Sequence, residues 1–369
     1  MDEIKVAKKL VSLKSYDNAD EPFGYIKELL ESEGIKVRTI TSDRVRNLHA
    51  ETGKGKKEIG FNGHYDTVPP GSGWKTDPLS PTVKDGKLYG LGATDMKGGL
   101  AAMLAAFIEL SKKELPIRVV FQAVGDEEIG GENGTKALVS KGLFAKRMVI
   151  GEPSGPRLEH AHKGVLRIEI RTSGKRAHGA RLYAGDNAIL RAIKIINHID
   201  RDNVLKLKAT KKQSEKVTTC NIGYFIGGMT ANVVPESCRF SLDIRVPAGE
   251  NMDEIIDYLG HLLDEKSRMK VLLRFNPMHT PSDDELVVTT KEIMEKYMGQ
   301  NVRLRTKLGA CDGHRFTSKG IPAVAVGPCA FDDKGNKVLH TIDEYIETDK
   351  IKLWKNIYKE LALHYSESK

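Results

Sequence analysis

Several features that mark common protein classes are missing from this sequence of 369 residues. There is no run of 18 apolar residues, which is about the length that a membrane-spanning helix needs. The most apolar segment, residues 98–110, is shorter and is followed by Ser111, Lys112 and Lys113, which indicates a buried helix. The first ten residues are typical of an amphipathic helix rather than a signal peptide, so we expect a cytoplasmic protein.

Cysteine is scarce, and no two cysteines stand close together in the sequence. The four cysteines, Cys220, Cys238, Cys311 and Cys329, lie far apart and form no Cys-x-x-Cys pair. This spacing does not support a cysteine-bound zinc ribbon, and we expect four free thiols.

Signatures of nucleotide binding and of serine hydrolases are also missing. Residues 90–95 read GLGATD, so Asp95 stands where a dinucleotide-binding motif needs its third glycine. A carboxylate at that position would repel pyrophosphate. The sequence contains neither a P-loop nor the Gly-x-Ser-x-Gly turn of a serine hydrolase.

Positive charge is in excess, with a net charge of +8 and an isoelectric point near 9.0. The lysines are spread along the whole chain, and no nucleic-acid-binding motif accompanies them. We therefore expect a solvated basic surface that favours small anionic substrates, with neither nucleic acid nor membrane as a partner. The remaining composition, 40% hydrophobic and 29% charged, is that of an ordinary globular protein long enough for two domains.

The order of the expected elements predicts an α/β protein. Apolar strand-like segments at 117–124, 147–150 and 321–326 alternate with helical segments at 98–110 and 350–364. Such alternation is typical of a central sheet flanked by helices. Residues 117–124 are apolar almost throughout, as expected for a parallel strand that is covered on both faces.

The middle of the chain follows a different pattern. Residues 165–171 alternate between apolar and polar, which is typical of a strand with one solvated face. With this strand as the first element, the expected helices and strands run in the order β-α-β-β-α-β, which predicts a ferredoxin-like unit. We expect this unit to be a domain of residues 164–277, inserted into a catalytic domain formed by residues 1–163 and 278–369.

Acidic and histidine residues gather where the predicted strands end. They are His64, Asp66, Asp95, Glu127, Glu128 and Glu152. In open α/β sheets, ligands bind outside the carboxyl ends of the strands. A single His or Asp in a loop is usually structural, and it is the shared placement that indicates a site. The adjacent pair Glu127–Glu128 also indicates a cation-binding site, because two neighbouring carboxylates in a dry place need a cation to offset their charge.

Five segments carry a resemblance to a known family. They are residues 63–69 (GHYDTVP), 90–99 (GLGATDMKGG), 125–131 (GDEEIGG), 151–154 (GEPS) and 339–341 (LHT). In this order they resemble the signatures of the co-catalytic zinc aminoacylase, desuccinylase and carboxypeptidase family of metallopeptidases, the M20 peptidases. The resemblance spans nearly the whole chain. It implies an α/β fold with a zinc-peptidase-like catalytic domain and an inserted ferredoxin-like lid that forms a homodimer.

The resemblance also implies a role for each motif residue. Two divalent metal ions are expected, with zinc preferred and cobalt or manganese as substitutes. His64 and Glu152 would bind the first ion, His340 and Glu128 the second, and Asp95 both, with a cis peptide bond after Asp95. Glu127 would be the general base and acid, and Asp66 would orient the His64 ring.

Further residues are assigned to the substrate by the same resemblance. His178 would reach the site of a partner subunit and donate to the oxyanion, and Asn232 and Arg245 would bind a substrate carboxylate. The segment 310–316 (ACDGHRF) departs from the family pattern, since His314 takes the position of the usual arginine and Arg315 follows it. We expect His314 and Arg315 to contribute to carboxylate recognition.

The expected activity is metal-dependent hydrolysis of an amide bond that links an acyl group to an amino acid. Glu152 stands where many aminopeptidase and dipeptidase relatives have Asp, which favours deacylases and carboxypeptidase-like members. The first expectation is a succinyl-diaminopimelate desuccinylase. The alternatives are a deacetylase of N-acetylornithine or another N-acetyl-amino acid, and a di- or tripeptidase or carboxypeptidase of the same family. A non-catalytic binding protein on this fold is disfavoured, because no expected ligand is missing.

Overall fold

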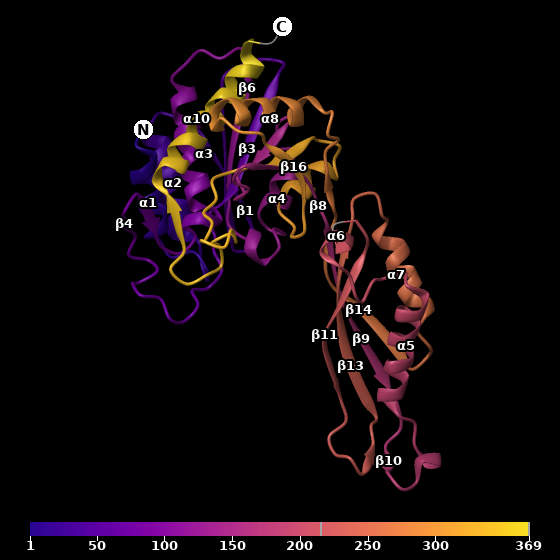
Figure 1. The fold of residues 1–369 in the computed structure, drawn as a ribbon. Coiled ribbons are helices and arrows are strands. Elements are labelled where there is room, and N and C mark those ends of the chain that lie inside the picture. The colour runs from indigo at the N-terminus through magenta and orange to yellow at the C-terminus, as the bar shows by residue number, and fades with distance from the viewer. Residues whose placement is uncertain (215, 368–369) are drawn as a thin grey trace. The chain divides into compact units, whose positions relative to one another are not determined.

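The computed structural model describes residues 1–214 and 216–367, and the chain divides into two compact units (Figure 1). The first unit consists of Met1–His160, His279–Arg305 and the residues from Cys311 onward. The second consists of Ala161–Met278 and Thr306–Ala310. In the part of the chain that is described, no helix combines the length and the hydrophobicity required to cross a membrane.

A mixed sheet forms the centre of the first unit. Its strands run in the order β1-β2-β6-β3-β7-β17-β8-β15, with β16 paired to β8. Their bounds are β1 Val37–Ser42, β2 Val45–Thr52, β3 Glu58–His64, β6 Arg118–Val124, β7 Met148–Ile150, β8 Arg157–His162, β15 Met278–His279, β16 Arg303–Lys307 and β17 Ala323–Ala325. A small second sheet contains β4 Thr82–Lys84, β5 Lys87–Tyr89 and β18 Tyr345–Glu347.

The middle of the large sheet is parallel, and this sets the position of the site. β3 pairs in parallel with β6 and with β7, and β17 pairs in parallel with β7. The register places His64 opposite Val124 and Asn62 opposite Ile150. The segments that follow β3, β6 and β7 therefore leave the sheet at the same edge, as the sequence predicted.

Helices cover this sheet and close the core. They are α1 Glu3–Val11, α2 Asp20–Ser32, α3 Gly98–Ser111, α4 Thr135–Ser140, α8 Glu285–Met298, α9 Gly313–Thr317 and α10 Thr348–Glu367, with two short turns, η1 Ala93–Lys97 and η2 Glu127–Ile129. α3 is buried on almost all sides, because its sequence is mostly Ala, Leu, Met and Phe. Phe107 of α3 stacks on Phe121 of β6 at 5.4 Å.

The second unit is the ferredoxin-like fold that the sequence predicted. β9 Gly164–Ser173, β11 Thr219–Gly227, β13 Ser237–Val246 and β14 Ser267–Phe275 form an antiparallel sheet in the order β11-β13-β9-β14. α5 Ala188–Asp202 and α7 Met252–His261 lie on one face of it (Figure 1). The smaller elements are β10 Ala177–His178, η3 Leu182–Ala184, α6 Lys211–Ser214 and β12 Val233–Val234.

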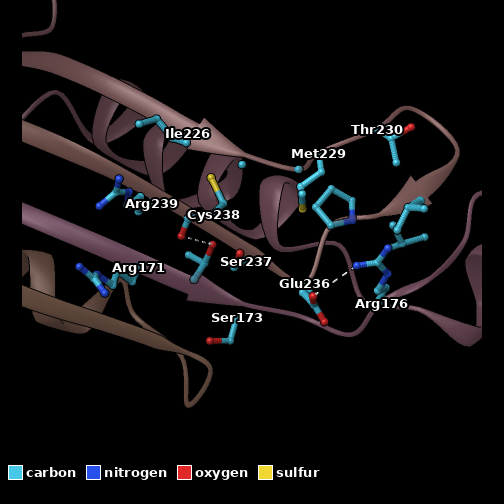
Figure 2. A pocket seen from close by; sticks show the side chains of 16 residues that line it. Arg171, Ser173, Arg176, Ile226, Met229, Thr230, Glu236, Ser237, Cys238 and Arg239 are labelled. Carbon is cyan, nitrogen blue, oxygen red and sulfur yellow. Dashed lines mark hydrogen bonds and ion pairs between the residues drawn. The ribbon is translucent and has the colours of Figure 1, made fainter.

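The other face of this sheet is rich in arginine. A cavity of about 420 Å³ lies there, lined among others by Arg171, Arg176 and Arg239 (Figure 2). The Arg171 Nε donates to Glu169 at 2.6 Å, and Arg176 lies 3.8 Å from Glu236. These carboxylates offset part of the positive charge, and none of the site residues expected from the sequence lines this cavity.

The second unit includes residues that the sequence assigned to the catalytic domain. They are residues 161–163 and Met278, at the expected boundaries, and the separate segment Thr306–Ala310. Thr306–Ala310 is held in the second unit by a backbone hydrogen bond, in which the Lys163 N–H donates to the Lys307 carbonyl at 3.0 Å. Alternation of apolar residues carries no information on such a contact between distant segments.

The close approach of α3 to the loop after β7 leads to a first prediction. A Cβ on Gly99 would lie 2.6 Å from the Gly151 carbonyl oxygen, which is backbone and cannot move aside easily. Gly99→Ala should therefore lower the free energy of unfolding by about 1–3 kcal/mol in urea denaturation.

Gly24→Ala is the matched control, since Gly24 also lies in a helix, but beyond its own helix backbone no atom of the described residues lies within 4 Å of the added carbon. It should raise the free energy of unfolding by about 0.5–1 kcal/mol, because alanine loses less chain entropy in a helix. Equal effects of the two changes would contradict the tight contact between α3 and Gly151.

Candidate metal centre

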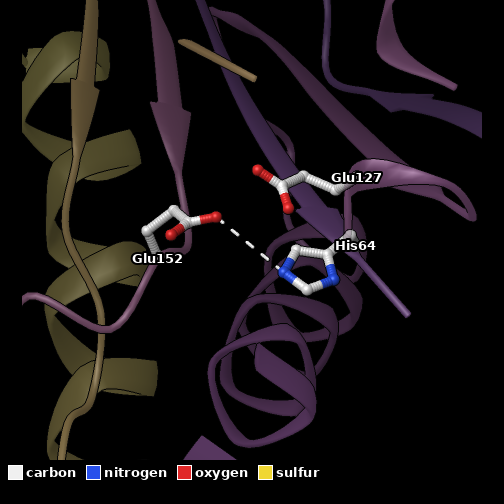
Figure 3. Close-up of side chains that lie close together, drawn as sticks. All are labelled: His64, Glu127 and Glu152. Carbon is white, nitrogen blue, oxygen red and sulfur yellow. Dashed lines mark ion pairs between the residues drawn. The ribbon is translucent and has the colours of Figure 1, made fainter. Parts of the chain in front are cut away.

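His64 lies at the centre of the acidic group, at the carboxyl end of β3. Its Nε2 atom is buried and finds no hydrogen-bond partner among the residues that the structure describes. It lies 3.3 Å from Asp95 Oδ1 and 3.8 Å from Glu152 Oε1. Figure 3 shows the carboxylates of Glu127 and Glu152 directed toward the ring of His64. A buried ring nitrogen that faces carboxylates in this way is suited to bind a metal ion.

His340 forms a second group with two of the same acidic residues. Its Nε2 lies 3.1 Å from Glu128 Oε1 and 3.4 Å from Asp95 Oδ2. The two carboxylate oxygens of Asp95 thus face different histidines, Oδ1 toward His64 and Oδ2 toward His340. This is the arrangement that a carboxylate shared by two cations would require.

Ligand atoms in this region lie close enough together to surround cations. Those of His64, Glu127 and Glu152 all lie within 4.8 Å of one another, and the same holds for His64, Asp95 and Glu128. Nitrogen and oxygen ligands without thiolates fit zinc, cobalt or manganese. The residues present therefore fit a centre for divalent ions, with Glu127 beside the first position.

Asp66 orients both the histidine and the glutamate pair. Its Oδ1 accepts a hydrogen bond from the Glu127 N–H at 3.2 Å, and its Oδ2 accepts one from the Glu128 N–H at 3.0 Å. The Nδ1 atom of His64 lies 3.0 Å from the Asp66 carbonyl oxygen, which directs Nε2 toward Asp95 and Glu152. Such contacts fix the ring and raise its basicity as a ligand.

The electrostatics of the group reflect its crowding. Burial, together with the nearby Glu152 carboxylate, holds the pKa of Glu127 well above its ordinary value. Burial also raises the pKa of Glu128. Hydrogen bonds to Asp95 and Glu128 raise the pKa of His340 to about 10. A divalent cation among these groups would offset the repulsion and favour ionised carboxylates and neutral histidines.

The turn that carries Asp95 has an unusual backbone. The peptide bond between Asp95 and Met96 is cis, as the resemblance implied. Gly92, at the start of the turn, has a φ of 75°, and a Cβ there would lie 2.5 Å from the Thr67 side chain. A glycine is therefore required at this position.

Three other buried acids, Glu344, Asp126 and Asp312, accept hydrogen bonds from segments that carry or adjoin the candidate ligands. The carboxylate of Glu344 accepts backbone N–H bonds from the turn that contains Asp95. Asp126 accepts a hydrogen bond from the Asn133 N–H at 2.7 Å, and Asp312 accepts a hydrogen bond from the Thr135 hydroxyl at 2.6 Å. Burial raises the pKa of Asp126 to about 6 and that of Asp312 to about 7. The sequence pointed to no role for Asp126, Asp312 or Glu344, because a single acid in a loop gives no signal.

Three of the expected substrate residues belong to the second unit. His178 and Asn232 lie side by side, since the Gly179 N–H donates to the Asn232 carbonyl at 2.7 Å and β10 pairs with β12. Arg245 lies near the far end of β13, paired with Asp243 at 2.6 Å. About eight residues of extended chain separate Arg245 from the β10–β12 pair, a span of roughly 25 Å.

His314 and Arg315 lie in the first unit on the short helix α9. His314 is buried, with its Nδ1 atom 2.9 Å from the Cys311 carbonyl oxygen. Arg315 donates to the Gly130 carbonyl at 2.9 Å and to Glu132 at 2.7 Å. Both contacts of Arg315 secure the loop that follows the Glu127–Glu128 pair, and a direct part in binding substrate stays a prediction for both residues.

Comparison with known proteins identifies the class. The sequence profile of peptidase family M20/M25/M40 matches residues 60–364, and the chain belongs to this family of metal-dependent amide hydrolases. Among curated proteins, it is 28% identical over 412 aligned positions to a probable succinyl-diaminopimelate desuccinylase of Staphylococcus aureus, covering 100% of this chain and 98% of that one. It is 27% identical to a succinyl-diaminopimelate desuccinylase of Rhizorhabdus wittichii, with 98% and 97% covered.

Solved structures share the fold at lower identity. An M20 family metallo-carboxypeptidase from Sulfolobus solfataricus aligns with a TM-score of 0.83 and 22% identity, covering 99% of both chains. The aminopeptidase PepT from Bacillus cereus gives a TM-score of 0.82, also at 22% identity, with 99% of this chain and 98% of that one covered. A dinuclear metal-binding M20 peptidase from Bacillus subtilis gives 0.73 at 15% identity, with 100% and 98% covered.

The contacts of Asp66 generate a second prediction. In Asp66→Asn one acceptor oxygen becomes an NH₂ group that faces a backbone N–H, so the Glu127–Glu128 turn loses its orientation, whereas the contact of His64 with the Asp66 backbone carbonyl is kept. Zinc affinity, measured by calorimetry, should fall about 10–100-fold.

Asp77→Asn is the control, because Asp77 also accepts a backbone N–H, from Leu79 at 2.9 Å, but in an exposed turn. It should leave zinc affinity unchanged. An unchanged affinity in Asp66→Asn would show that Asp66 does not orient the ligands.

Proposed function

We propose that this protein is a two-metal amide hydrolase that removes an N-acyl group from an amino acid, with N-succinyl-diaminopimelate as its first candidate substrate. The observation that supports it most directly is the pair of Asp95 oxygens, each facing a different histidine. The names of the curated relatives support the choice of substrate.

Five residues would hold the two ions in this proposal. His64 and Glu152 would bind the first, His340 and Glu128 the second, and Asp95 both. When bound, divalent ions such as zinc polarise the scissile carbonyl and acidify water. The three carboxylates carry a charge of −3, which offsets most of the charge of two divalent ions in this partly buried place.

Glu127 would move the proton in the reaction. Its carboxylate lies next to His64 and Glu152 but faces the same space, and its backbone N–H is fixed by Asp66. It can therefore accept a proton from the attacking water and deliver it to the leaving amine. His178, Asn232, Arg245, His314 and Arg315 remain the proposed residues for the oxyanion and the substrate carboxylates.

An M20 peptidase or carboxypeptidase is the second candidate function. The solved structures with the same fold include a metallo-carboxypeptidase and an aminopeptidase. A deacetylase of N-acetylornithine or a related N-acetyl-amino acid would use the same centre and differs in the acyl group and in the amino acid that carries it. The net charge of +8 favours anionic substrates in each case.

We also propose that two copies of the chain associate through the second unit. β11 is an edge strand of its sheet, and Phe225 and Ile226 on it are exposed. On the adjoining start of α5, Leu190 and Ile193 are exposed as well. An apolar edge strand beside an apolar helix face is suited to pair with a second copy.

The substrate assignment is tested by hydrolysis of a small panel in the presence of zinc or cobalt: N-succinyl-diaminopimelate, N-acetylornithine, acetyl-methionine and several dipeptides. N-succinyl-diaminopimelate should be hydrolysed, with release of succinate, faster than every other member of the panel. Glu127→Gln should lower the rate on the best substrate about 10²–10⁴-fold while keeping the bound metal, because only proton transfer is removed.

Glu114→Gln changes an exposed carboxylate outside the site and should keep full activity. Cleavage of dipeptides alone would favour the peptidase function. A protein that binds metal yet cleaves no member of the panel would refute the deacylase proposal.

The association of two copies gives a further prediction. Ile193→Glu places a charge on the proposed contact and should convert the dimer to a monomer in sedimentation velocity, because burying an unpaired carboxylate is costly. Val288→Glu is matched, since Val288 lies on a helix of the first unit at 41% exposure against 40% for Ile193. It should leave the dimer intact. A wild type that sediments as a monomer would contradict the proposal.

A further inference from the structure

Glu344 is a buried acid in the first unit that the proposed reaction does not use. Its side chain is 1% exposed, and its carboxylate points at the backbone of the turn that carries Asp95. Oε1 accepts hydrogen bonds from the N–H groups of Thr94, at 2.8 Å, and Asp95, at 3.0 Å. Oε2 accepts one from the N–H of Gly92 at 3.0 Å. Three amides of one turn thus converge on a single carboxylate.

Bonds on either side of the carboxylate strengthen this connection. The Gly90 N–H donates to the Glu344 carbonyl at 2.9 Å, and the Thr94 hydroxyl donates to the Tyr345 carbonyl at 2.5 Å. β18, which begins at Tyr345, pairs with β5 just before the turn. The segment from Gly90 to Asp95 is therefore attached to residues 344 and 345 at several points.

The location of Glu344 in the chain gives these bonds a consequence for the site. Glu344 follows His340 by four residues, while Asp95 is 249 residues away along the sequence. His340 Nε2 lies 3.4 Å from Asp95 Oδ2. The contact between Glu344 and the turn thus joins the two segments whose side chains meet in the second metal group. It does so with three backbone N–H bonds that converge on the two oxygens of one buried carboxyl group.

We infer that Glu344 is a positioning residue of the metal centre, which sets the separation between Asp95 and His340 by binding the backbone of residues 92–95. This inference rests on the two-metal centre of the proposed function. Glu344 touches neither ion nor substrate in this account. It acts through Asp95, the ligand that both ions share, so its loss should weaken the binding of both ions.

Two variants separate positioning from charge. Glu344→Gln keeps the shape but leaves one acceptor oxygen, and its NH₂ group would face an N–H of the turn. It also removes a negative charge near the ions, which could weaken cation binding by itself. Thr94→Val removes the hydroxyl and with it the bond to the Tyr345 carbonyl, and it changes no charge. Thr94 is fully buried, and valine has nearly the same shape, so the packing around residue 94 is kept.

The readout is the affinity for cobalt, followed by visible absorption during titration of the metal-free full chain, alongside the melting temperature. Glu344→Gln should weaken cobalt binding about 10–100-fold, and Thr94→Val about 3–10-fold. Glu3→Gln is the control: Glu3 is a buried acid paired with Lys355 at 3.1 Å, in helix α1. It should lower the melting temperature and leave cobalt affinity unchanged.

Other outcomes count against the inference. If Glu344→Gln folds and binds cobalt within about twofold of wild type, Glu344 is only structural. If Glu344→Gln weakens binding while Thr94→Val does not, Glu344 acts through its charge. If Glu344→Gln fails to fold, Thr94→Val tests the same junction between residues 90–95 and 344–345 through the bond to the Tyr345 carbonyl, and unchanged cobalt affinity in Thr94→Val then overturns the inference. A wild type that binds no cobalt refutes the metal centre itself, whereas a wild type that binds cobalt beside unaffected variants refutes only the role of Glu344.

Discussion

Mutual repulsion among buried carboxylates is the constraint on which the first unit depends. Asp95, Glu127, Glu128 and Glu152 come from three different segments, and burial raises the pKa of both members of the Glu127–Glu128 pair. The fold brings them together by rigid means: parallel strands that end at one edge, backbone bonds to Asp66, and the carboxylate of Glu344 behind Asp95. The cost of this arrangement is offset once cations bind, which links the fold directly to metal-dependent hydrolysis.

Much of the framework could be predicted because the signals are periodic. The apolar run at 117–124 predicted a strand and became β6, and the alternation at 165–171 predicted the half-solvated strand β9. The order β-α-β-β-α-β was enough for the ferredoxin-like unit. For the site, the position of His64, Glu127 and Glu152 after parallel strands predicted a common edge, and the structure confirms it.

Contacts that depend on tertiary structure could not be predicted in this way. Glu344 lies in a segment without any recognisable pattern, and its partners are 249–252 residues away. Thr306–Ala310 joins the second unit through a backbone bond that no residue type specifies. In the structure Arg315 also binds Gly130 and Glu132, and its place in the sequence gave no sign of these contacts. Hydrogen bonds between distant backbones leave no trace in hydrophobic periodicity.

The central claim is that Asp95 is shared by two ions, and metal content tests it most directly. Metal-free protein is equilibrated with zinc, freed of excess by gel filtration, and analysed for zinc per chain. We predict two equivalents for the wild type and a loss of both in Asp95→Asn, because one carboxylate serves both positions. A single equivalent in the wild type, or two equivalents retained by Asp95→Asn, would contradict the account.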